Sequence, residues 1–283
     1  MLSDSFLARL DAMRLAVRGR AQGGAGGSRR SAKLGSSAEF SDYREYIPGD
    51  DIRRLDWNAL ARFDKLFVKL FMEEQESAVT ILLDGSASMA EKWDTARMAA
   101  ETVGYLALTG GDRLKVVFLQ EGEPRVSPVL SGRPAYARLE QFLDLCVPAG
   151  AGSLTESVQH LDGLRKGLCF LISDCYVPEG MDGILDFLRY CRQETGVIHV
   201  LSAFELAPEL DGAVRLTDAE TGEKVDVLAD RETAEQYRQA LEAFLADVKG
   251  SCFQREAPYL LLDGGKNFEE EMIPLLAGSG IIG

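Results

Sequence analysis

Short, largely apolar runs rich in β-branched residues alternate with amphipathic stretches from residue 77 onward, as in sheets whose parallel strands are buried. The predicted strands cover 78–83, 113–119, 168–173, 197–201 and 258–262, and two more short strands flank a turn at 217–222. Between the strands, apolar positions recur every three or four residues, which predicts helices. The predicted helices cover about 91–108, 135–146, 154–165, 180–193, 231–248 and 267–276. This alternation predicts an α/β fold with a mainly parallel, doubly wound sheet covered on both faces.

The beginning of the chain follows a different pattern, and we expect residues 1–75 to form an extension ahead of a domain at 76–283. Apolar residues at three- and four-residue spacings predict an amphipathic helix over 3–18, packed on protein rather than on lipid. The glycine-rich stretch 22–28 behind it predicts a flexible linker. A further strand is predicted at 66–72.

Charge is distributed unevenly along the chain. Residues 1–70 carry 13 basic and 9 acidic side chains, a net charge of +4, whereas residues 71–283 carry a net charge of −18. An acidic body repels phosphate backbones, so nucleic acid is not an expected partner. The basic N-terminal segment has two expected docking surfaces: the acidic body of the chain itself or, as the alternative, a membrane surface in a peripheral contact.

The cysteines and the N-terminus predict a cytoplasmic protein. The five cysteines include no CxxC pair, and several stand in apolar runs, so we expect them to be reduced and mostly buried. No apolar run approaches the roughly 18 residues that span a bilayer. The N-terminus also lacks the apolar core and cleavage site of a secretory signal.

Side chains with oxygen ligands gather directly after the first predicted strand. Asp84, Ser86 and Ser88 lie on a tight turn that Gly85 permits, and Asp174 directly follows another apolar strand. Because the carboxyl ends of parallel strands meet at one edge of a sheet, we expect these groups to lie together. Carboxylates and hydroxyls suit a hard divalent cation, so the sequence predicts a Mg²⁺ or Mn²⁺ site with a position open to an incoming carboxylate. The alternative is that Asp84 and Ser86 only cap a helix.

The Asp-x-Ser-x-Ser turn with Met89 behind it, together with Ser173-Asp174 after a second strand, resembles the metal-ion-dependent adhesion site of von Willebrand factor A domains. The resemblance implies that the metal binds a protein partner and is not catalytic. It also implies a threonine ligand from an intervening loop, which here reads Gly-Ala-Gly-Ser-Leu-Thr-Glu-Ser over 150–157. If one residue is deleted, Ser153 matches that threonine, and Thr155 is the other candidate.

A longer tract over 39–62 contains Tyr-x-Pro-Gly-Asp-Asp-x-Arg-x-x-Asp-Trp and is similar to bacterial proteins of the domain of unknown function 58 family. The similarity continues through 215–222 and Tyr237 into the final strand and helix. It implies a von Willebrand factor A-like core with an N-terminal extension. It also implies an adaptor or chaperone-like role beside a MoxR-type AAA+ ATPase, in the assembly or maturation of other proteins.

The same tract is rich in aromatic residues and in charges of both signs, which leaves two interpretations open. One is a structural ion-pair network that ties the extension to the domain, with Tyr46 and Trp57 packed beneath it. The other is a partner-docking surface, because Arg, Tyr and Trp are enriched at binding hot spots. The candidate partner-binding residues are Tyr43, Arg44, Asp50, Asp51, Arg53, Asp56, Trp57 and Arg62.

Enzymatic alternatives find little support in the sequence. The stretch 264–267 lacks the spacing of a Walker A loop, so we expect any ATP use to belong to a partner. His160 and His199 are the two histidines of the chain, and we interpret both as structural. The remaining alternative is a metal-dependent hydrolase or phosphatase that uses Asp84 and Asp174. We expect a non-catalytic protein.

Overall fold

The computed structural model describes residues 2–16, 38–47, 55–63, 65–73, 77–208 and 212–282. The chain forms two compact units. Met1–Val17 and Ser77–Gly283 together form an α/β domain, and Arg18–Glu76 form a second unit. The second unit is therefore inserted into the domain, which differs from the expected single boundary between residues 75 and 76.

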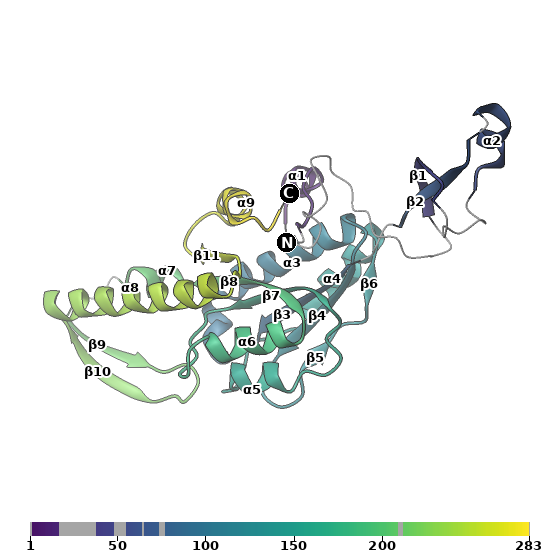
Figure 1. The fold of residues 1–283 in the computed structure, drawn as a ribbon. Helices are drawn as coiled ribbons and strands as arrows, with labels where there is room; N and C mark the ends of the chain where they lie inside the picture. The colour runs from purple at the N-terminus through teal and green to yellow at the C-terminus, as the bar shows by residue number, and fades with distance from the viewer. Residues whose placement is uncertain are drawn as a thin grey trace. The chain divides into compact units, whose positions relative to one another are not determined.

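Within the described residues, seven strands build the central sheet of the α/β domain, in the order β11-β8-β7-β3-β4-β5, and β6 also pairs with β4 (Figure 1). The strands are β3 (Ala78–Asp84), β4 (Arg113–Leu119), β5 (Arg125–Val126), β6 (Leu130–Ser131), β7 (Gly167–Ser173), β8 (Gln193–Leu201) and β11 (Tyr259–Asp263). The five longer strands are parallel, and the two short ones run antiparallel to β4. The predicted α/β fold with a mainly parallel sheet is confirmed.

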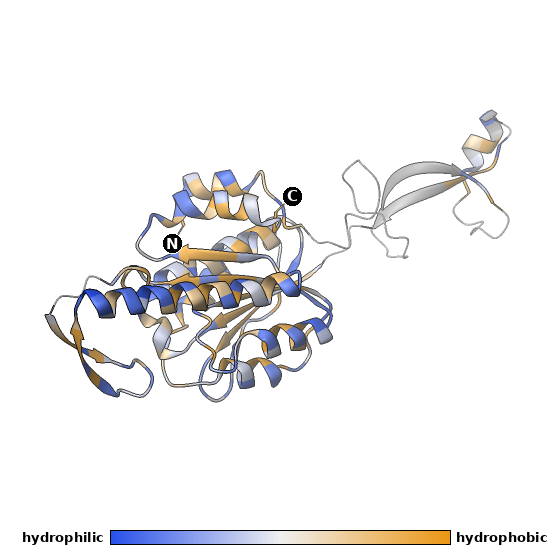
Figure 2. Ribbon diagram, turned by 60° about the vertical axis from the view of Figure 1, so that its left-hand side comes forward, coloured by the Kyte–Doolittle hydropathy of each residue, from blue (hydrophilic) through white to orange (hydrophobic). Residues whose placement is uncertain are grey.

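Helices cover both faces of this sheet (Figures 1 and 2). They are α1 (Asp4–Leu10), α3 (Trp93–Thr109), α4 (Tyr136–Asp144), α5 (Leu154–Gln159), α6 (Asp182–Tyr190), α7 (Ala203–Leu206), α8 (Arg231–Gln254) and α9 (Phe268–Ser279), with 3₁₀ turns η3 (Ala87–Lys92) and η4 (Arg133–Ala135). Ile81 and Leu83 of β3 lie in one core with residues of α1, α3, α4 and α9, whereas Leu82 lies in a second core with α6 and α8. No helix in the described part of the chain is long and apolar enough to cross a membrane.

The N-terminal helix is shorter than predicted and packs on the α/β domain. It ends at Leu10, not near residue 18, and its buried side chains Phe6 and Leu10 belong to the core that includes α3 and α9. Leu15 then forms an antiparallel bridge with Ile282, which joins the two ends of the domain. The expectation that this helix packs on protein is confirmed, but residues 2–16 belong to the domain and not to the extension.

Several boundaries differ from the predicted ones. Helix α5 ends at Gln159 instead of 165, and α8 continues to Gln254 instead of 248. The edge strands β5 and β6 were not predicted, because two residues are too few to show a periodic pattern.

The second unit contains an antiparallel pair of strands, β1 (Ala38–Glu45) and β2 (Phe67–Glu73), and the helix α2 (Trp57–Phe63). Strand β2 is the strand predicted at 66–72. Strand β1 was not predicted, because it mixes charged, aromatic and small residues without strict alternation.

A separate two-stranded ribbon leads into α8. Its strands are β9 (Gly212–Thr217) and β10 (Lys224–Ala229), which pair antiparallel. They are the short strands predicted on either side of the turn at 217–222.

Candidate functional site

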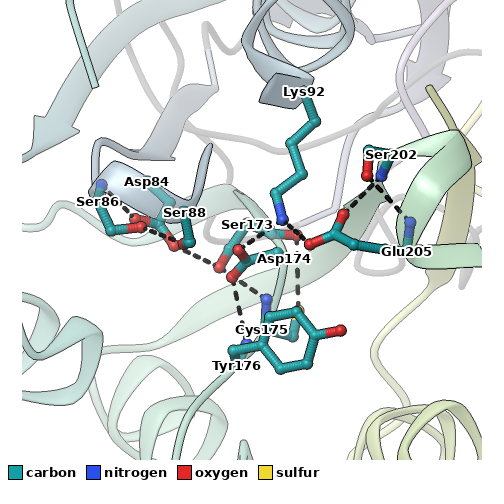
Figure 3. Close-up of polar contacts among 10 residues, drawn as sticks. All are labelled: Asp84, Ser86, Ser88, Lys92, Ser173, Asp174, Cys175, Tyr176, Ser202 and Glu205. Atoms are coloured by element: carbon teal, nitrogen blue, oxygen red, sulfur yellow. Dashed lines mark hydrogen bonds and ion pairs between the residues drawn. The ribbon is translucent and has the colours of Figure 1, made fainter. Parts of the chain in front are cut away.

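Two carboxylates meet at the edge of the sheet where β3 and β7 end. These strands are parallel neighbours in which Leu83 pairs with Ile172. Asp84 at the end of β3 and Asp174 just after β7 therefore emerge at the same edge of the sheet, one residue apart in register, and both are buried. Figure 3 shows the two side chains directed into one small region. The structure thus brings together the two acidic residues on which the predicted site depends.

Gly85 makes the turn after β3 possible. Its N–H donates to the Leu119 carbonyl at 2.7 Å, so its backbone lies directly against the end of β4. A Cβ at this position would lie 2.4 Å from the Phe118 ring. Any residue other than glycine would therefore push the turn away from β4 and displace the side chains that follow.

The two serine hydroxyls of the turn lie next to each other. Ser86 occupies the position before η3, yet its side chain makes no capping hydrogen bond. Instead, Ser86 Oγ lies 3.0 Å from Ser88 Oγ, beside Asp84 (Figure 3). The helix-cap alternative therefore does not describe Ser86, because the oxygen that would cap the helix is turned toward another hydroxyl.

Asp84 receives hydrogen bonds but no cation. The Ser173 hydroxyl donates to Oδ2 at 2.6 Å, and the Ser86 N–H donates to Oδ1 at 3.0 Å. Among the described residues, no basic side chain forms an ion pair with this carboxylate. Burial and then the negative charge of Asp174 raise the pKa of Asp84. Its ionised form is therefore short of positive charge.

Asp174, in contrast, is neutralised by a buried lysine. Lys92 Nζ lies 2.8 Å from Asp174 Oδ2 and 2.5 Å from Glu205 Oε1 (Figure 3), and its side chain is only 1% exposed. Burial lowers the pKa of Lys92, but the charges and hydrogen bonds of the two carboxylates outweigh this effect and raise it overall. Lys92 therefore carries a full positive charge.

Lys92 and Glu205 were not identified from the sequence, although each has a signal there. Met89, Lys92 and Ala96 are spaced by three and four residues, so the lysine falls on the buried face of a helix, where a charge requires a partner. Ser202 and Glu205 form a capping box at the start of α7, just after β8. Glu205 Oε2 accepts from the Ser202 N–H at 2.7 Å, which leaves Oε1 for Lys92.

The loop between α4 and α5 lies against the turn after β3, but its two candidate ligands differ. The Gly150 carbonyl accepts from the Ala87 N–H at 3.0 Å, which joins the loop to the turn. Ser153 is exposed, and its Oγ accepts from the Glu156 N–H at 3.2 Å as the N-cap of α5. Thr155 Oγ1 is buried and has no hydrogen-bond partner among the described residues. Ser153 and Thr155 both stay candidates for the loop ligand.

A small cavity beside Asp84 is lined by polar residues and by the apolar side chains Leu119 and Leu154. The residues that line it include Asp84, Ser86, Gln120, Glu121, Gly152 and Ser157. Across the described chain, no group of three or more His, Cys, Asp and Glu side chains is arranged as a metal site. A cation here would therefore depend on hydroxyls and water as well as carboxylate. That set fits Mg²⁺ or Mn²⁺, which keep several waters, and not a metal that prefers sulfur or imidazole.

His199 is a packed residue of β8. Its Nδ1 lies 2.9 Å from the Tyr259 hydroxyl, and its ring stands at 90° to the Phe244 ring. Burial lowers the pKa of His199 to about 4. The side chain is therefore neutral near neutral pH, as expected of a structural histidine.

The candidate partner-binding residues lie in the second unit, away from this site in the sequence. Asp50, Asp51 and Arg53 lie outside the described residues, and the backbones of Tyr43 and Arg44 belong to β1. Asp56 is buried, and its Oδ1 accepts from the Ala59 N–H at 3.2 Å at the start of α2. Trp57 is 64% exposed and Arg62 is exposed. Trp57 therefore does not pack within the second unit, and the interpretation of a charged network between the extension and the domain stays a prediction.

Comparison with known proteins identifies relatives of this chain. Residues 42–246 match the family described as "Protein of unknown function DUF58". The uncharacterized protein Rv1480 of Mycobacterium tuberculosis strain H37Rv is 27% identical over 281 residues, which cover 95% of this chain and 88% of that protein. The uncharacterized protein Mb1516 of Mycobacterium bovis matches with the same identity and coverage.

Two solved structures are also similar. BatB from Bacteroides thetaiotaomicron is 14% identical with a TM-score of 0.40, and the match covers 72% of this chain and 98% of that one. The SpRpn10 VWA domain is 11% identical with a TM-score of 0.42, and the match covers 73% of this chain and 96% of that one.

Proposed function

This chain belongs to the DUF58 family, and from that membership and the chemistry of its sheet edge we propose that it is a non-catalytic, metal-dependent protein-binding adaptor. The observation that carries the proposal is the difference between its two buried carboxylates. Lys92 already neutralises Asp174, whereas Asp84 lies beside two serine hydroxyls without any cation among the described residues. A divalent cation would supply the missing positive charge at Asp84.

The cation that we propose is Mg²⁺ or Mn²⁺. Its protein ligands are Asp84, Ser86, Ser88 and Asp174, with Ser153 or Thr155 from the loop. When bound, the ion supplies an electron-poor centre with a coordination position for an incoming carboxylate. Neutral hydroxyls add ligand oxygens without cancelling the charge of the ion. The buried orphan hydroxyl of Thr155 supports a site that has a ligand still to receive.

The partner that we propose offers a carboxylate from its own surface. An aromatic surface beside the site supports a protein ligand: Tyr176 is 48% exposed, stacks on Phe244 with ring centroids 4.7 Å apart, and lies 5.6 Å from Lys92 Nζ. Exposed tyrosines are favoured at binding hot spots. Because the sequence has no Walker A loop, we propose that a MoxR-type AAA+ ATPase, the partner class implied by the family resemblance, supplies ATP hydrolysis during assembly or maturation of other proteins.

The test is an affinity capture with the full chain immobilised, in Mg²⁺ and in chelator, with mass-spectrometric identification of the captured proteins. Wild type is compared with Asp84→Ala and with Asp94→Ala, which removes the same charge from an exposed position in the first turn of α3. We expect a MoxR-type ATPase to be captured in Mg²⁺ by wild type and Asp94→Ala, and to be lost in chelator and in Asp84→Ala. In calorimetry, wild type and Asp94→Ala should bind Mn²⁺, and Asp84→Ala should not.

Three outcomes contradict the proposal. If wild type does not bind Mn²⁺ at millimolar concentration, the proposed metal site is wrong. If capture is equal in Mg²⁺ and in chelator, the metal has no role in partner binding. Turnover of phosphate esters by wild type and not by Asp84→Ala replaces the adaptor with the hydrolase alternative.

A further inference from the structure

One face of the ribbon formed by β9 and β10 is apolar. Val225 lies opposite Leu216 and Val227 lies opposite Val214 in the antiparallel register. Side chains paired across two strands stand on the same face, and successive residues alternate between faces, so these four side chains share one face. Leu216 and Val225, the pair nearer the turn, are 39% and 58% exposed. The apolar face is therefore open to solvent at this end of the ribbon.

The opposite face of the ribbon is the one that suits water. It carries an exposed ion pair in which Arg215 Nε lies 2.6 Å from Asp226 Oδ1. A two-stranded element with one apolar and one polar face normally packs its apolar face on a core. Leu216 and Val225, however, belong to neither hydrophobic core of the described part of the chain. The apolar face thus lacks a covering layer within the described residues.

The ribbon also has a free edge. Among the described residues, β9 pairs with no strand other than β10, and its backbone has no other hydrogen bond. The edge of β10 is partly occupied, because the Leu228 carbonyl accepts from the Asp230 N–H at 3.0 Å and from Thr233 Oγ1 at 3.1 Å. Unpaired N–H and C=O groups on an edge strand can bind a further strand. Two strands alone are marginally stable, so a third strand would also stabilise the ribbon.

The turn at the open end of the ribbon is acidic. Residues 218–223 hold three acidic side chains and no basic one, and Asp218, Glu220 and Glu223 are all exposed. Glu220 and Glu223 form no ion pair within the described residues. Opposite charges steer two surfaces together and like charges oppose their association, so a segment that covers the neighbouring apolar face should be basic.

We propose that the free edge of β9 binds a partner strand in which apolar residues alternate with lysine or arginine. The backbone of the partner strand pairs with β9, and its apolar side chains cover Leu216 and Val225. Its basic side chains lie near the carboxylates of the turn. This contact does not use Asp84 or Asp174, so it stands independently of the cation site proposed above.

The probe is a fluorescent peptide of about eight alternating valine and lysine residues, a common strand length, titrated with the full chain and followed by anisotropy. Alternating serine and lysine controls for charge alone, and alternating valine and glutamate controls for apolar character alone. We expect the valine–lysine peptide to bind at least about tenfold more tightly than either control. Equal binding of the two lysine peptides would overturn the proposal, because it would show attraction to the net negative charge of the chain and not to the apolar face.

Val225→Ser tests the apolar face directly. Leu228→Ser is its matched control, because Leu228 is 64% exposed and stands on the opposite face of the same strand. We expect Val225→Ser to weaken binding of the valine–lysine peptide by about tenfold and Leu228→Ser to stay within about twofold of wild type. If both variants bind as tightly as wild type, the proposed surface is wrong. If wild type forms dimers in sedimentation that Val225→Ser abolishes, a second copy of the chain covers the face instead of a basic partner.

The acidic border is tested by Glu220→Gln combined with Glu223→Gln. We expect this pair to weaken binding about fivefold at low salt. Glu123→Gln combined with Asp162→Asn removes two charges from exposed positions elsewhere and should stay within about twofold of wild type. Equal weakening by the two pairs would contradict a specific role for the turn.

Hydrogen exchange tests the strand pairing. The valine–lysine peptide should slow exchange of backbone amides in β9 and leave those of the central strand β7 unchanged. If the peptide binds while exchange in β9 stays as in the free protein, strand addition is wrong.

Discussion

The two acidic residues at the sheet edge stand at the ends of neighbouring strands, yet they have opposite surroundings. Asp174 is paired with Lys92, which also reaches Glu205. Asp84 is surrounded by hydrogen-bond donors without formal charge, from Ser173 and Ser86. One half of the edge thus has a buried ammonium shared between two carboxylates, and the other half is polar but has no counterion among the described residues.

This difference predicts that the two carboxylates contribute to different properties, one to folding stability and the other to cation binding. A buried carboxylate with a matched ammonium contributes to the folded state, and removal of one partner leaves the other uncompensated. A buried carboxylate without a counterion is costly until a cation arrives. We therefore expect substitution of Lys92 to act mainly on folding and substitution of Asp84 to act mainly on cation binding.

The largest effect should follow from Lys92→Met, which leaves the buried Asp174 and the partly buried Glu205 without their cation. We expect a loss of about 3 to 5 kcal/mol in the free energy of unfolding, measured by urea denaturation. Lys166→Met, at an exposed position, is the matched control and should remain close to wild type. If Lys92→Met is as stable as its control, the ion pair does not hold this half of the site.

A second effect concerns His199. Burial lowers its pKa to about 4, and the nearby charge of Asp174 offsets only part of this shift. The folded protein therefore keeps His199 neutral while the unfolded chain takes up a proton below its ordinary pKa of 6.5. Stability from this residue is complete above pH 6.5 and is lost as the pH falls toward 4, by about 2 to 3 kcal/mol. Urea denaturation of wild type and His199→Gln at several pH values measures this loss. An imidazole NMR titration with a midpoint near 6.5 would contradict it.

Asp84→Asn should affect cation binding more than stability, the opposite of what we expect for Lys92→Met. The amide oxygen can still accept from the Ser86 N–H, and the amide NH₂ can donate to the Ser173 hydroxyl. The change also removes an uncompensated charge, so we expect the free energy of unfolding to change by no more than about 1 kcal/mol. Mn²⁺ binding should be lost, as measured by calorimetry on the same sample. A large loss of stability would mean that Asp84 holds the fold together and not an ion.

The smallest effects should come from the loop and should decide between its two candidates. Substitution of the true ligand is expected to weaken Mn²⁺ binding by about tenfold, and substitution of the other to change it by less than about twofold. The variants are Ser153→Ala and Thr155→Val. Ser153→Ala should also cost about 1 kcal/mol of stability, because it removes the N-cap of α5. If both variants bind Mn²⁺ as tightly as wild type, neither side chain is a ligand.

Much of the fold was predictable from the sequence because its strands and helices carry strong periodic patterns. The run 78–83 needed no tertiary information, since six consecutive residues suited to a buried strand exclude most alternatives. The lengths of α1 and α5 were not predictable. Apolar residues such as Met13 continue the helical spacing although α1 has already ended at Leu10. The local sequence gives no sign of the packing that ends the helix.

The site was predictable only in part, for a physical reason. Asp84 and Asp174 come directly after strands, so the rule about carboxyl ends of parallel strands brings them together. Lys92 and Glu205 meet through a contact between segments 113 residues apart in the chain. A single sequence shows that a lysine lies on a buried helical face but does not name its partner. Aromatic character alone also does not tell which side of a short helix faces solvent, as the exposed Trp57 shows.

The bridge between Leu15 and Ile282 has a consequence for how the chain can be divided. A shortened protein that starts at Ser77 would lose Phe6 and Leu10 and would open the hydrophobic layer beneath α9 to water. Excision of residues 18–76 with a short glycine-serine replacement would instead keep that layer closed. In the chain, the inserted unit is followed by β3, the strand that ends in Asp84.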